Sequence, residues 1–368
     1  MEIEIHNIGD NIGPEKIMLL RQPRVGLEAV VVVDNVACGP AIGGVRMAPD
    51  LTIDEIYRLS RAMTLKSAAA GLPHGGAKSG IINDPACSFE QKEILMRTFA
   101  RMIRELTEYI PGPDMGTNEE CMAWVKDETG RAIGLPRVLG GIPLDEIGAT
   151  GFGVAITAEV AAPEAGISLK GSQLAVQGFG AVGRHAANFL VKQGAILVAV
   201  SDSRGAIQNH NGLDIDALIK HKKEGSPVHT FPGGQAIDRE ELVGIKCDIW
   251  IPAARPDALT ENNIDQLKAK LVIHGANIPA TETAEKLMHK KGILNIPDFI
   301  ANAGGVICAA VEFRGGSESQ VMKTIEEKIR INTLETLERS KRENLLPREA
   351  AVRMAYSRIK KAMTYRGT

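Results

Sequence analysis

The sequence predicts an α/β protein of two domains. From residue 170 to 300, short apolar strands alternate with helices, which is the pattern of a parallel sheet covered by helices. Within this stretch, residues 173–190 (QLAVQGFGAVGRHAANFL) have the pattern of a strand, a glycine turn and a helix. The chain has 368 residues, 44% of them hydrophobic, which is enough to fill two cores. Further strands are predicted at residues 195–200, 247–253, 270–277 and 293–297.

The remaining elements follow in order along the chain. Residues 27–34 (LEAVVVVD) are rich in β-branched side chains and predict a strand, after which helices and glycine loops continue to about residue 145. Ser317 and Gln320 form a capping box before a charged helix, and Pro347 starts another. We expect an N-terminal domain of residues 1–145, joined by a C-terminal helix of about 335–368, and a second domain of residues 146–334.

Gly178, Gly180 and Gly183 have the G-x-G-x-x-G spacing of a dinucleotide-binding turn. The first glycine supplies the tight turn, the second lets backbone amides approach a pyrophosphate, and the third lets helix and strand pack closely. The helix N-terminus then stabilises the anion. An ordinary glycine turn is the alternative, but the flanking strand and helix and an acid downstream favour a dinucleotide site. The second domain is therefore expected to be of the Rossmann type.

Asp202 is that acid. It follows the predicted strand at residues 195–200 and can accept hydrogen bonds from both ribose hydroxyls of NAD. Ser203 and Arg204 come next and could hold the 2′-phosphate of NADP if the loop turns outward. NAD is expected first, with NADP possible.

Charge and cysteine content exclude several classes of protein. A net charge of −2 gives no general attraction to nucleic acid or to an anionic membrane, so small molecules are the expected partners. The five cysteines are scattered, without a CxxC or His/Cys cluster, which predicts no disulfides, no metal site and a reducing compartment. The N-terminus lacks the basic and apolar regions of a signal sequence, and no apolar stretch approaches a membrane span. A cytoplasmic protein is expected.

Two lysines precede the dinucleotide motif. Lys78 lies among glycines in the run LPHGGAKSG (72–80), which gives it close backbone neighbours, although a lysine in a flexible loop is the alternative. Lys66 continues the apolar face of a predicted helix, where an apolar residue is expected; a lysine reaching outward near a helix C-terminus is equally compatible. Partial burial and a second lysine nearby lower the pKa of an amine, which makes a lysine a base near neutral pH.

Asp114 lies in the run YIPGPDMGTNEE (109–120), a turn stiffened by proline and glycine. Thr117 and Glu120 are predicted to cap the helix that follows. A turn aspartate that accepts hydrogen bonds from local amides is the alternative. A lysine held among glycines, together with a dinucleotide site, suggests a lysine-assisted redox enzyme.

Seven motifs, in order through almost the whole chain, resemble those of the glutamate/leucine/phenylalanine/valine dehydrogenase family. They are GPAIGGVRM (39–47), MTLKSAAAGLPHGGAKSG (63–80), PGPDMGT (111–117), GATGFGV (148–154), QGFGAVG (177–183), HGANIP (274–279) and IPDFIANAGGV (296–306). The resemblance implies an N-terminal substrate and oligomerisation domain, a C-terminal dinucleotide domain, a cleft between them, and a homo-oligomer.

The resemblance also implies residue roles. Lys78 resembles the catalytic lysine, Asp114 its proton-transfer partner, and Lys66 the lysine that holds the substrate α-carboxylate. The other substrate-binding positions would be Ile42, Gly43, Gly44, Gly112, Asn302, Val306 and Ala309. The cofactor-binding positions would be Thr150, Gly178, Phe179, Gly180, Ala181, Val182, Gly183, Asp202, Ser203, Ala253, Asn277 and Asn302. His74 departs from the family, whose members often have a larger apolar or aromatic residue there.

The implied reaction is the reversible NAD(P)-dependent oxidative deamination of an L-amino acid to a 2-oxo acid and ammonia. Glutamate-specific relatives carry a lysine at the position of Ile42 and a serine at that of Ala309. A buried carboxylate without partners is costly, so a pocket of Ile42, Val306 and Ala309 predicts an apolar substrate such as leucine, valine or phenylalanine. Gly112 would leave room for a bulky side chain. The motifs PGPDMGTNEE, VSDSRGAIQ and HGANIP resemble the glutamate branch instead, which keeps glutamate dehydrogenase as the alternative.

Two other classes stay open at this point. A 2-hydroxy-acid dehydrogenase would need a histidine base with a carboxylate partner and a substrate arginine, and His185 is better explained as a structural residue of the glycine-motif helix. A catalytically silent sensor of nucleotide or amino acid is the other class. The joint presence of Lys66, Lys78 and Asp114 argues against it.

Overall fold

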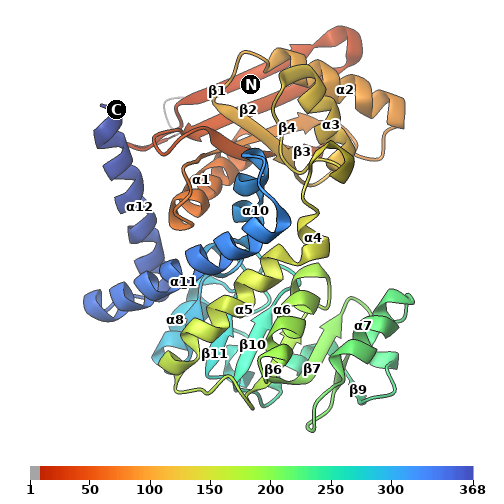
Figure 1. Cartoon of the computed structure of the whole chain (residues 1–368), viewed down its shortest axis with the longest axis vertical. Helices are drawn as coiled ribbons and strands as arrows, with labels where there is room; N and C mark the ends of the chain where they lie inside the picture. Colours follow the sequence, from red (N-terminus) through yellow and green to blue (C-terminus); the bar gives the residue numbers. More distant parts are fainter. Residues whose placement is uncertain (1–8, 368) are drawn as a thin grey trace. The chain divides into compact units, whose positions relative to one another are not determined.

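The computed structural model describes residues 9–367, so the acidic stretch at residues 1–8 lies outside the described part. The chain forms two compact units, each with its own sheet (Figure 1). Unit 1 consists of Met1–Pro143, Val306–Val321 and Arg353–Thr368, and unit 2 of Leu144–Gly305 and Met322–Val352.

Unit 1 contains a five-stranded mixed sheet in the order β1-β2-β4-β3-β5. The strands are β1 (Lys16–Gln22), β2 (Leu27–Asn35), β3 (Ala41–Ala48), β4 (Gly75–Ile82) and β5 (Tyr109–Pro113). The predicted strand at residues 27–34 is confirmed as β2. β1 and β4 both pair with β2 in antiparallel fashion, whereas β3 runs parallel to β4 and β5. β3 therefore has a parallel neighbour on each side.

Helices cover both faces of this sheet. α1 (Ile53–Ala69) packs on one face, where Ile56 contacts a core that includes Val30 and Val32. α2 (Phe89–Met102) and α3 (Glu119–Thr129) cover the other face, over a larger core that includes Val31 and Phe99 (Figure 1). Neighbouring valines of β2 reach different cores because side chains alternate along a strand.

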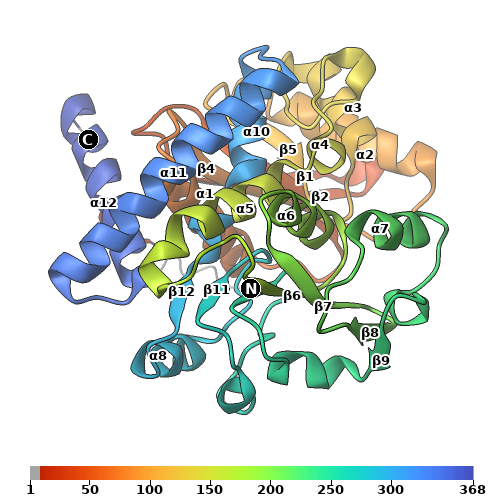
Figure 2. The same ribbon diagram turned by 60° about the horizontal axis from the view of Figure 1, so that its bottom comes forward.

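Unit 2 contains a seven-stranded sheet in the order β12-β11-β10-β6-β7-β8-β9. The strands are β6 (Gln173–Gln177), β7 (Ile196–Asp202), β8 (Gly205–Gln208), β9 (Gln235–Ile237), β10 (Ile249–Pro252), β11 (Leu271–Ile273) and β12 (Leu294–Ile296). The five strands predicted from the alternating pattern are confirmed and run parallel. β8 and β9, which were not predicted, add an antiparallel edge. Figure 2 shows β12 and β11 at one end of the sheet beside α8, and β8 and β9 at the other end beside α7.

The remaining helices are α4 (Leu144–Ile147), α5 (Ala149–Ala161), α6 (Ala181–Lys192), α7 (Ile215–Lys223), α8 (Glu282–Lys290), α9 (Asp298–Ala301), α10 (Gly304–Phe313), α11 (Glu318–Glu343) and α12 (Pro347–Arg366). The capping box before α11 is confirmed: the Ser317 amide donates to Gln320 Oε1 at 2.7 Å, and the Gln320 amide donates to Ser317 Oγ at 3.4 Å. Within residues 9–367, no helix combines the length and apolarity of a membrane span.

This division into units differs from the predicted one in two places. Residues 306–321 group with unit 1, because Glu312 on α10 accepts hydrogen bonds from the amides of Leu135 at 3.1 Å and Ile142 at 3.0 Å. The C-terminal return to unit 1 begins at Arg353 instead of near residue 335, because most of α11 groups with unit 2. Helical periodicity locates these helices but does not show which core they join.

Candidate active site

Strand alternation places a set of functional side chains on the face of the unit 1 sheet that α1 covers. On β4, the neighbour of Lys78, Ala77, belongs to the core under α2 and α3, so Lys78 points to the other face. On β3, Val45 belongs to that same core, so Gly44 and Arg46 share the face of Lys78. Lys78 on β4 and Arg46 on β3 therefore lie on the same face of two neighbouring strands.

Lys78 pairs with Asp114 on this face. Lys78 Nζ lies 3.0 Å from Asp114 Oδ1, and Arg46 Nε donates to Asp114 Oδ2 at 2.7 Å. Arg46 Nη1 also donates to Glu55 Oε1 at 2.7 Å. The Lys78 side chain is 7% exposed and that of Asp114 22%, so the carboxylate keeps an accessible part. Sequence reasoning missed the contact of Arg46 with Asp114, which the alternation of β3 could have indicated because Arg46 follows Gly44 by two positions.

The surroundings shift both pKa values of the pair downward. Burial lowers the pKa of the Lys78 ammonium, and the charge of Asp114 offsets only part of this effect. Burial alone would raise the pKa of the Asp114 carboxyl, but the charges of Lys78 and Arg46 outweigh it, and the pKa lies below its ordinary value. Lys78 therefore loses its proton more easily than an exposed lysine, while Asp114 stays ionised.

Gly44 provides the space in which the pair meets. A β-carbon at Gly44 would lie 2.8 Å from Asp114 Cβ and 3.2 Å from Lys78 Nζ. Such contacts are shorter than packed side chains allow, so any side chain at this position would displace the lysine or the aspartate. The Lys78–Asp114 contact thus depends on a glycine in the strand between them.

The other two glycines predicted to line the substrate site have packing roles. A β-carbon at Gly43 would lie 1.8 Å from Ala77 O, so Gly43 lets β3 and β4 approach. A β-carbon at Gly112 would lie 2.9 Å from Ile133 Cδ1. The expectation that Gly112 leaves room for a bulky substrate is therefore corrected, because the Ile133 side chain fills that space.

Thr117 holds the loop that carries Asp114. Its Oγ1 accepts a hydrogen bond from the Asp114 amide at 3.0 Å and donates to Val45 O at 2.8 Å. The predicted helix cap at Thr117 is wrong, because Asn118 caps α3 by accepting from the Cys121 amide at 3.0 Å. Thr117 therefore holds the Asp114 loop, and Asn118 caps α3.

Lys66 lies half-buried near the C-terminal end of α1. The fully buried stripe of this helix contains Ile56, Ser60 and Thr64. The two small polar residues allow close packing on β4, where a β-carbon at Gly76 would lie 2.0 Å from the Thr64 amide nitrogen. Of the face that Lys66 was predicted to continue, Ile56 is buried but Leu59 and Met63 are half-buried, so the lysine extends a half-buried flank and does not replace a core residue.

The side chains predicted to form an apolar pocket all belong to unit 1. Ile42 is 2% exposed and, two positions before Gly44, lies on the same face of β3. Val306 and Ala309 lie about one turn apart on α10 and are 7% and 9% exposed. These three buried side chains bear no charge.

His74 has a structural explanation that the sequence did not give. Its Nδ1–H donates to Pro40 O at 3.0 Å, and its ring packs edge-on against Phe313 with ring centres 5.9 Å apart. Burial lowers the pKa of His74, and the nearby charge of Arg314 lowers it further, so the ring is neutral at pH 7.

In unit 2 the three glycines of the predicted dinucleotide motif differ in geometry. Gly178 has φ of +97°, and a β-carbon there would lie 2.8 Å from Ala254 Cβ. A β-carbon at Gly183 would lie 1.9 Å from Gly178 O, so the glycine allows α6 to pack against β6. Gly180 has nothing within 4 Å of its β-carbon position and precedes Ala181, the first residue of α6. The geometry fits a tight turn, close packing and an open approach for a pyrophosphate.

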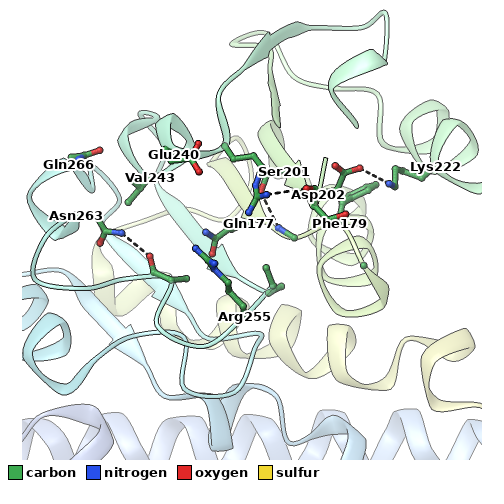
Figure 3. Close-up of a pocket in the computed structure, with 17 residues that line it drawn as sticks. Gln177, Phe179, Ser201, Asp202, Lys222, Glu240, Val243, Arg255, Asn263 and Gln266 are labelled. Atoms are coloured by element: carbon green, nitrogen blue, oxygen red, sulfur yellow. Dashed lines mark hydrogen bonds and ion pairs between the residues drawn. The ribbon is translucent and has the colours of Figure 1, made fainter. Parts of the chain in front are cut away.

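A pocket of about 750 Å³ adjoins this motif (Figure 3). Its lining includes the predicted residues Gly178, Phe179, Gly180, Asp202, Ser203 and Ala253. It also includes three cationic residues that were not predicted, Lys222, Arg239 and Arg255. Ala181 and Val182 form the first turn of α6.

Asp202 is engaged on both oxygens. Oδ1 accepts from the amides of Arg204 at 2.8 Å and Gly205 at 3.1 Å. Oδ2 accepts from Lys222 Nζ at 2.6 Å (Figure 3). It also accepts from the Val228 amide at 3.0 Å. Burial acts to raise the pKa of Asp202, but these donors outweigh it and the pKa lies below its ordinary value. The carboxylate therefore shapes its own loop, and Lys222 neutralises its charge.

Three further residues predicted to contact the cofactor lie close together in unit 2. Asn302 is 4% exposed, and its Nδ2 donates to Asn277 Oδ1 at 2.9 Å. Asn302 Oδ1 is buried and has no hydrogen-bond partner among residues 9–367. Thr150 Oγ1 would lie 3.1 Å from a β-carbon at Gly305. An unpaired carbonyl acceptor at this place fits a ligand that carries an N–H donor, such as the carboxamide of a nicotinamide.

Two family models together cover nearly the whole chain. Residues 14–131 match the Glu/Leu/Phe/Val dehydrogenase dimerisation domain, and residues 140–367 match Glutamate/Leucine/Phenylalanine/Valine dehydrogenase. The chain belongs to the glutamate/leucine/phenylalanine/valine dehydrogenase family. It is accordingly an NAD(P)-dependent amino acid dehydrogenase acting on CH–NH2 donors, and the enzyme class expected from the sequence is confirmed.

Individual relatives of this family member differ in the substrate that their names state. A glutamate dehydrogenase of Aeropyrum pernix is 39% identical over 357 residues, which are 90% of this chain and 85% of the relative. The solved structure of a hetero-hexameric glutamate dehydrogenase from Thermus thermophilus, in a leucine-bound form, has a TM-score of 0.83 at 30% identity and covers 96% of this chain and 90% of its own. The solved structure of an L-tryptophan dehydrogenase from Nostoc punctiforme has a TM-score of 0.78 at 26% identity, covering 96% and 97%.

The Gly44 geometry leads to a first prediction. Gly44→Ala should lower turnover by roughly a hundredfold, because a shift of about 1 Å in an acid-base pair has an effect of this size. The affinity for NAD(P), measured by calorimetry, should stay within twofold, because the dinucleotide pocket is lined by residues of unit 2. Turnover close to that of the wild type would show that Lys78 and Asp114 tolerate a side chain between them.

Proposed function

We propose that this dehydrogenase catalyses the reversible oxidative deamination of L-glutamate to 2-oxoglutarate and ammonia, with NADP as its better cofactor. The reaction class rests chiefly on one observation, the pair of buried Lys78 and partly exposed Asp114 in the space left by Gly44. An amine with a lowered pKa next to a carboxylate is a general base with a proton acceptor at hand. We also propose a homo-oligomer, which the match to a dimerisation domain supports.

The residues then act as follows. The bound nicotinamide supplies the hydride acceptor for the Cα of the amino acid. Neutral Lys78 activates a water for attack on the resulting imine carbon, and its ammonium form stabilises the oxygen that becomes negative. Asp114, 3.0 Å from Lys78 Nζ, carries protons between the lysine and the departing ammonia. Arg46 keeps Asp114 ionised and in place, and Lys66 holds the substrate α-carboxylate.

Removal of either member of the pair tests this mechanism. Lys78→Ala and Asp114→Asn should each lower kcat by a factor of roughly a hundred or more, because each loses a positioned acid-base group. Dissociation constants for NAD(P), measured by fluorescence quenching, serve as the control and should not change. Rates near those of the wild type in either variant would exclude that residue from proton transfer.

The mechanism also predicts the direction in which kcat/KM changes with pH. Lys78 acts as the base when deprotonated, so kcat/KM rises with pH as its lowered pKa is passed. Asp114 raises the pKa of Lys78, and its neutralisation in Asp114→Asn should move this rise to lower pH. A shift to higher pH would mean that a different group titrates.

Glutamate is the first candidate substrate because of the relatives. The Aeropyrum pernix enzyme is named a glutamate dehydrogenase at 39% identity over most of both chains. Our sequence-based preference for leucine, valine or phenylalanine is not confirmed, and the comparisons support the alternative better. A distal carboxylate needs a cation, and Arg46 is already shared between Asp114 and Glu55. Arg314 is the better candidate, since it is exposed and directly follows Phe313, whose ring packs against His74 in unit 1.

An apolar amino acid is the second candidate, and one observation favours it. Ile42 is buried on β3 and shares the alternation of Gly44, and Ala309 is buried on α10, so neither offers a group to a carboxylate. The tryptophan dehydrogenase among the solved relatives shows that the family fold also serves an apolar side chain.

A panel of 2-oxo acids with ammonia and NADPH decides between the two substrates. We expect the highest kcat/KM for 2-oxoglutarate, and in Arg314→Met a loss of about tenfold or more for that substrate alone, because the cation pairs only with the distal carboxylate. The 2-oxo acid of leucine serves as the internal control in the same variant. A wild-type preference for that apolar substrate would establish the second candidate, and Ile42→Lys with Ala309→Ser should then move the preference towards 2-oxoglutarate.

The cofactor proposal rests on the charge balance around Asp202. An acid with free oxygens would favour NAD by binding the ribose hydroxyls and repelling a 2′-phosphate. In this structure both oxygens accept hydrogen bonds within the protein, and Lys222 lies 2.6 Å from one of them. Arg239 lines the same pocket and donates to Ser203 O at 3.0 Å. Two cations beside a neutralised acid support NADP, in place of the NAD expected first from the sequence.

The ratio of kcat/KM for NADP to that for NAD tests this proposal. It should exceed one in the wild type and fall by about tenfold in Lys222→Met, because the variant removes a cation and leaves the Asp202 charge uncompensated. Arg255→Met, which removes a cation from another part of the pocket lining, is the control. A wild-type preference for NAD would show that Asp202 exchanges its internal partners for the ribose.

A further inference from the structure

A buried ion cluster lies at the start of α12 in unit 2, away from the glycine motif. Arg348 Nε lies 2.8 Å from both carboxylate oxygens of Glu285, and Arg348 Nη2 donates to Asp298 Oδ1 at 2.8 Å. The two carboxylate side chains are 3% and 8% exposed. The guanidinium also lies 5.6 Å from the ring centre of Phe299. Buried charges of this kind are costly unless the cluster is fully paired, so their position calls for a reason beyond stability.

The second oxygen of Asp298 holds an unusual turn. Asp298 Oδ2 accepts a hydrogen bond from the Ile278 amide at 3.0 Å. Ile278 has φ of +47° and is 59% exposed. A β-branched residue rarely adopts a left-handed conformation, and such strain persists only where surrounding contacts fix it. Asp298 fixes the amide side of this turn by accepting from Ile278 N–H, while the Asp257 amide donates to Ile278 O at 3.0 Å on the other side.

The strained turn adjoins the predicted nicotinamide contacts. Asn277 precedes Ile278, and its Oδ1 accepts from Asn302 Nδ2 at 2.9 Å. This hydrogen bond turns the Asn302 amide so that its buried Oδ1 is left without a partner within the described chain. Asn302 Nδ2 also lies 3.4 Å from Gly275 O, so the Asn277 contact is the shorter of the two that orient the Asn302 amide, and a change in the loop would weaken its orientation. The orientation of the unpaired acceptor thus depends in part on Asp298, which Arg348 holds in place.

We propose that Arg348 is a positioning residue for the cofactor: through Asp298 it fixes the turn at Asn277–Ile278 and thereby the Asn302 carbonyl that receives the nicotinamide carboxamide. The inference rests on the proposed dinucleotide site in unit 2 and on no property of the amino acid substrate. Arg348 is not among the residues that line the pocket of the glycine motif.

Two pairs of ligands, in which the members of each pair differ only in the nicotinamide, distinguish this positioning role from a purely structural one. ADP-ribose and its 2′-phosphate contain everything in NAD and NADP except the nicotinamide. In Arg348→Met, calorimetry should show an affinity for NAD and NADP that is about tenfold weaker, with the affinity for the two ADP-ribose ligands changed by less than twofold. Arg348→Lys, which keeps a cation, should recover part of the loss. Arg330→Met is the matched control, since Arg330 pairs with Glu159 in the same unit and should leave all four affinities unchanged.

Equal losses for the nicotinamide-containing ligands and for ADP-ribose would overturn the proposal, because they indicate a general disturbance of unit 2. No loss in any affinity would overturn it as well. If Arg348→Met does not fold, Asp298→Asn gives the same test, since it weakens the hold on the Ile278 amide while keeping the volume of the side chain. Binding is measured without an amino acid, so an error in the proposed substrate leaves the result readable, whereas a chain that binds none of the four ligands would refute the dinucleotide site itself.

Discussion

The close approach of a buried lysine to a partly buried aspartate is the constraint on which the architecture of unit 1 depends. Both charges lose hydration, so the contact is stable only if geometry and neighbouring charges are favourable. The strand order β4-β3-β5 meets this condition, because the strand of Lys78 and the strand that leads to Asp114 lie on either side of β3. Only one residue of β3 then stands between the two side chains, and Gly44 at this position removes the obstacle. Arg46, two positions later on the same face, adds the compensating charge.

The periodic parts of the fold were predictable from the sequence, and the parts set by hydrogen-bond choice were not. The strands of unit 2 appear in the sequence as continuous apolar runs, which predict a parallel sheet because its strands are buried on both faces. The edge strands β8 and β9 lie in a polar segment without that signal. At the start of α3, Thr117 and Asn118 are both able to cap, and only the structure shows that the threonine serves the Asp114 loop.

The candidate site shows the same limit at the level of single side chains. The pattern of a strand, three glycines and an acid predicted where Asp202 lies, but not that Lys222, on a later helix, would pair with it. Gly112 was predicted to leave space because no neighbour in the sequence fills it, whereas Ile133 does so from another segment. Residues that are distant in the sequence but adjacent in the fold determine whether a group is free to bind a ligand. A single sequence does not identify these residues.

The interleaved connectivity of the two units has a consequence for synthesis of the chain. When the first 143 residues have been made, the Leu135 and Ile142 amides still lack the Glu312 carboxylate that accepts their hydrogen bonds. The carbonyls of Ala68 and Ala69 likewise lack Arg358, which donates to them from α12. Unit 1 therefore cannot reach its native set of hydrogen bonds while the ribosome is still translating unit 2. Until residues 312 and 358 have been made, these backbone groups of the N-terminal segment can bond only to water or to non-native partners.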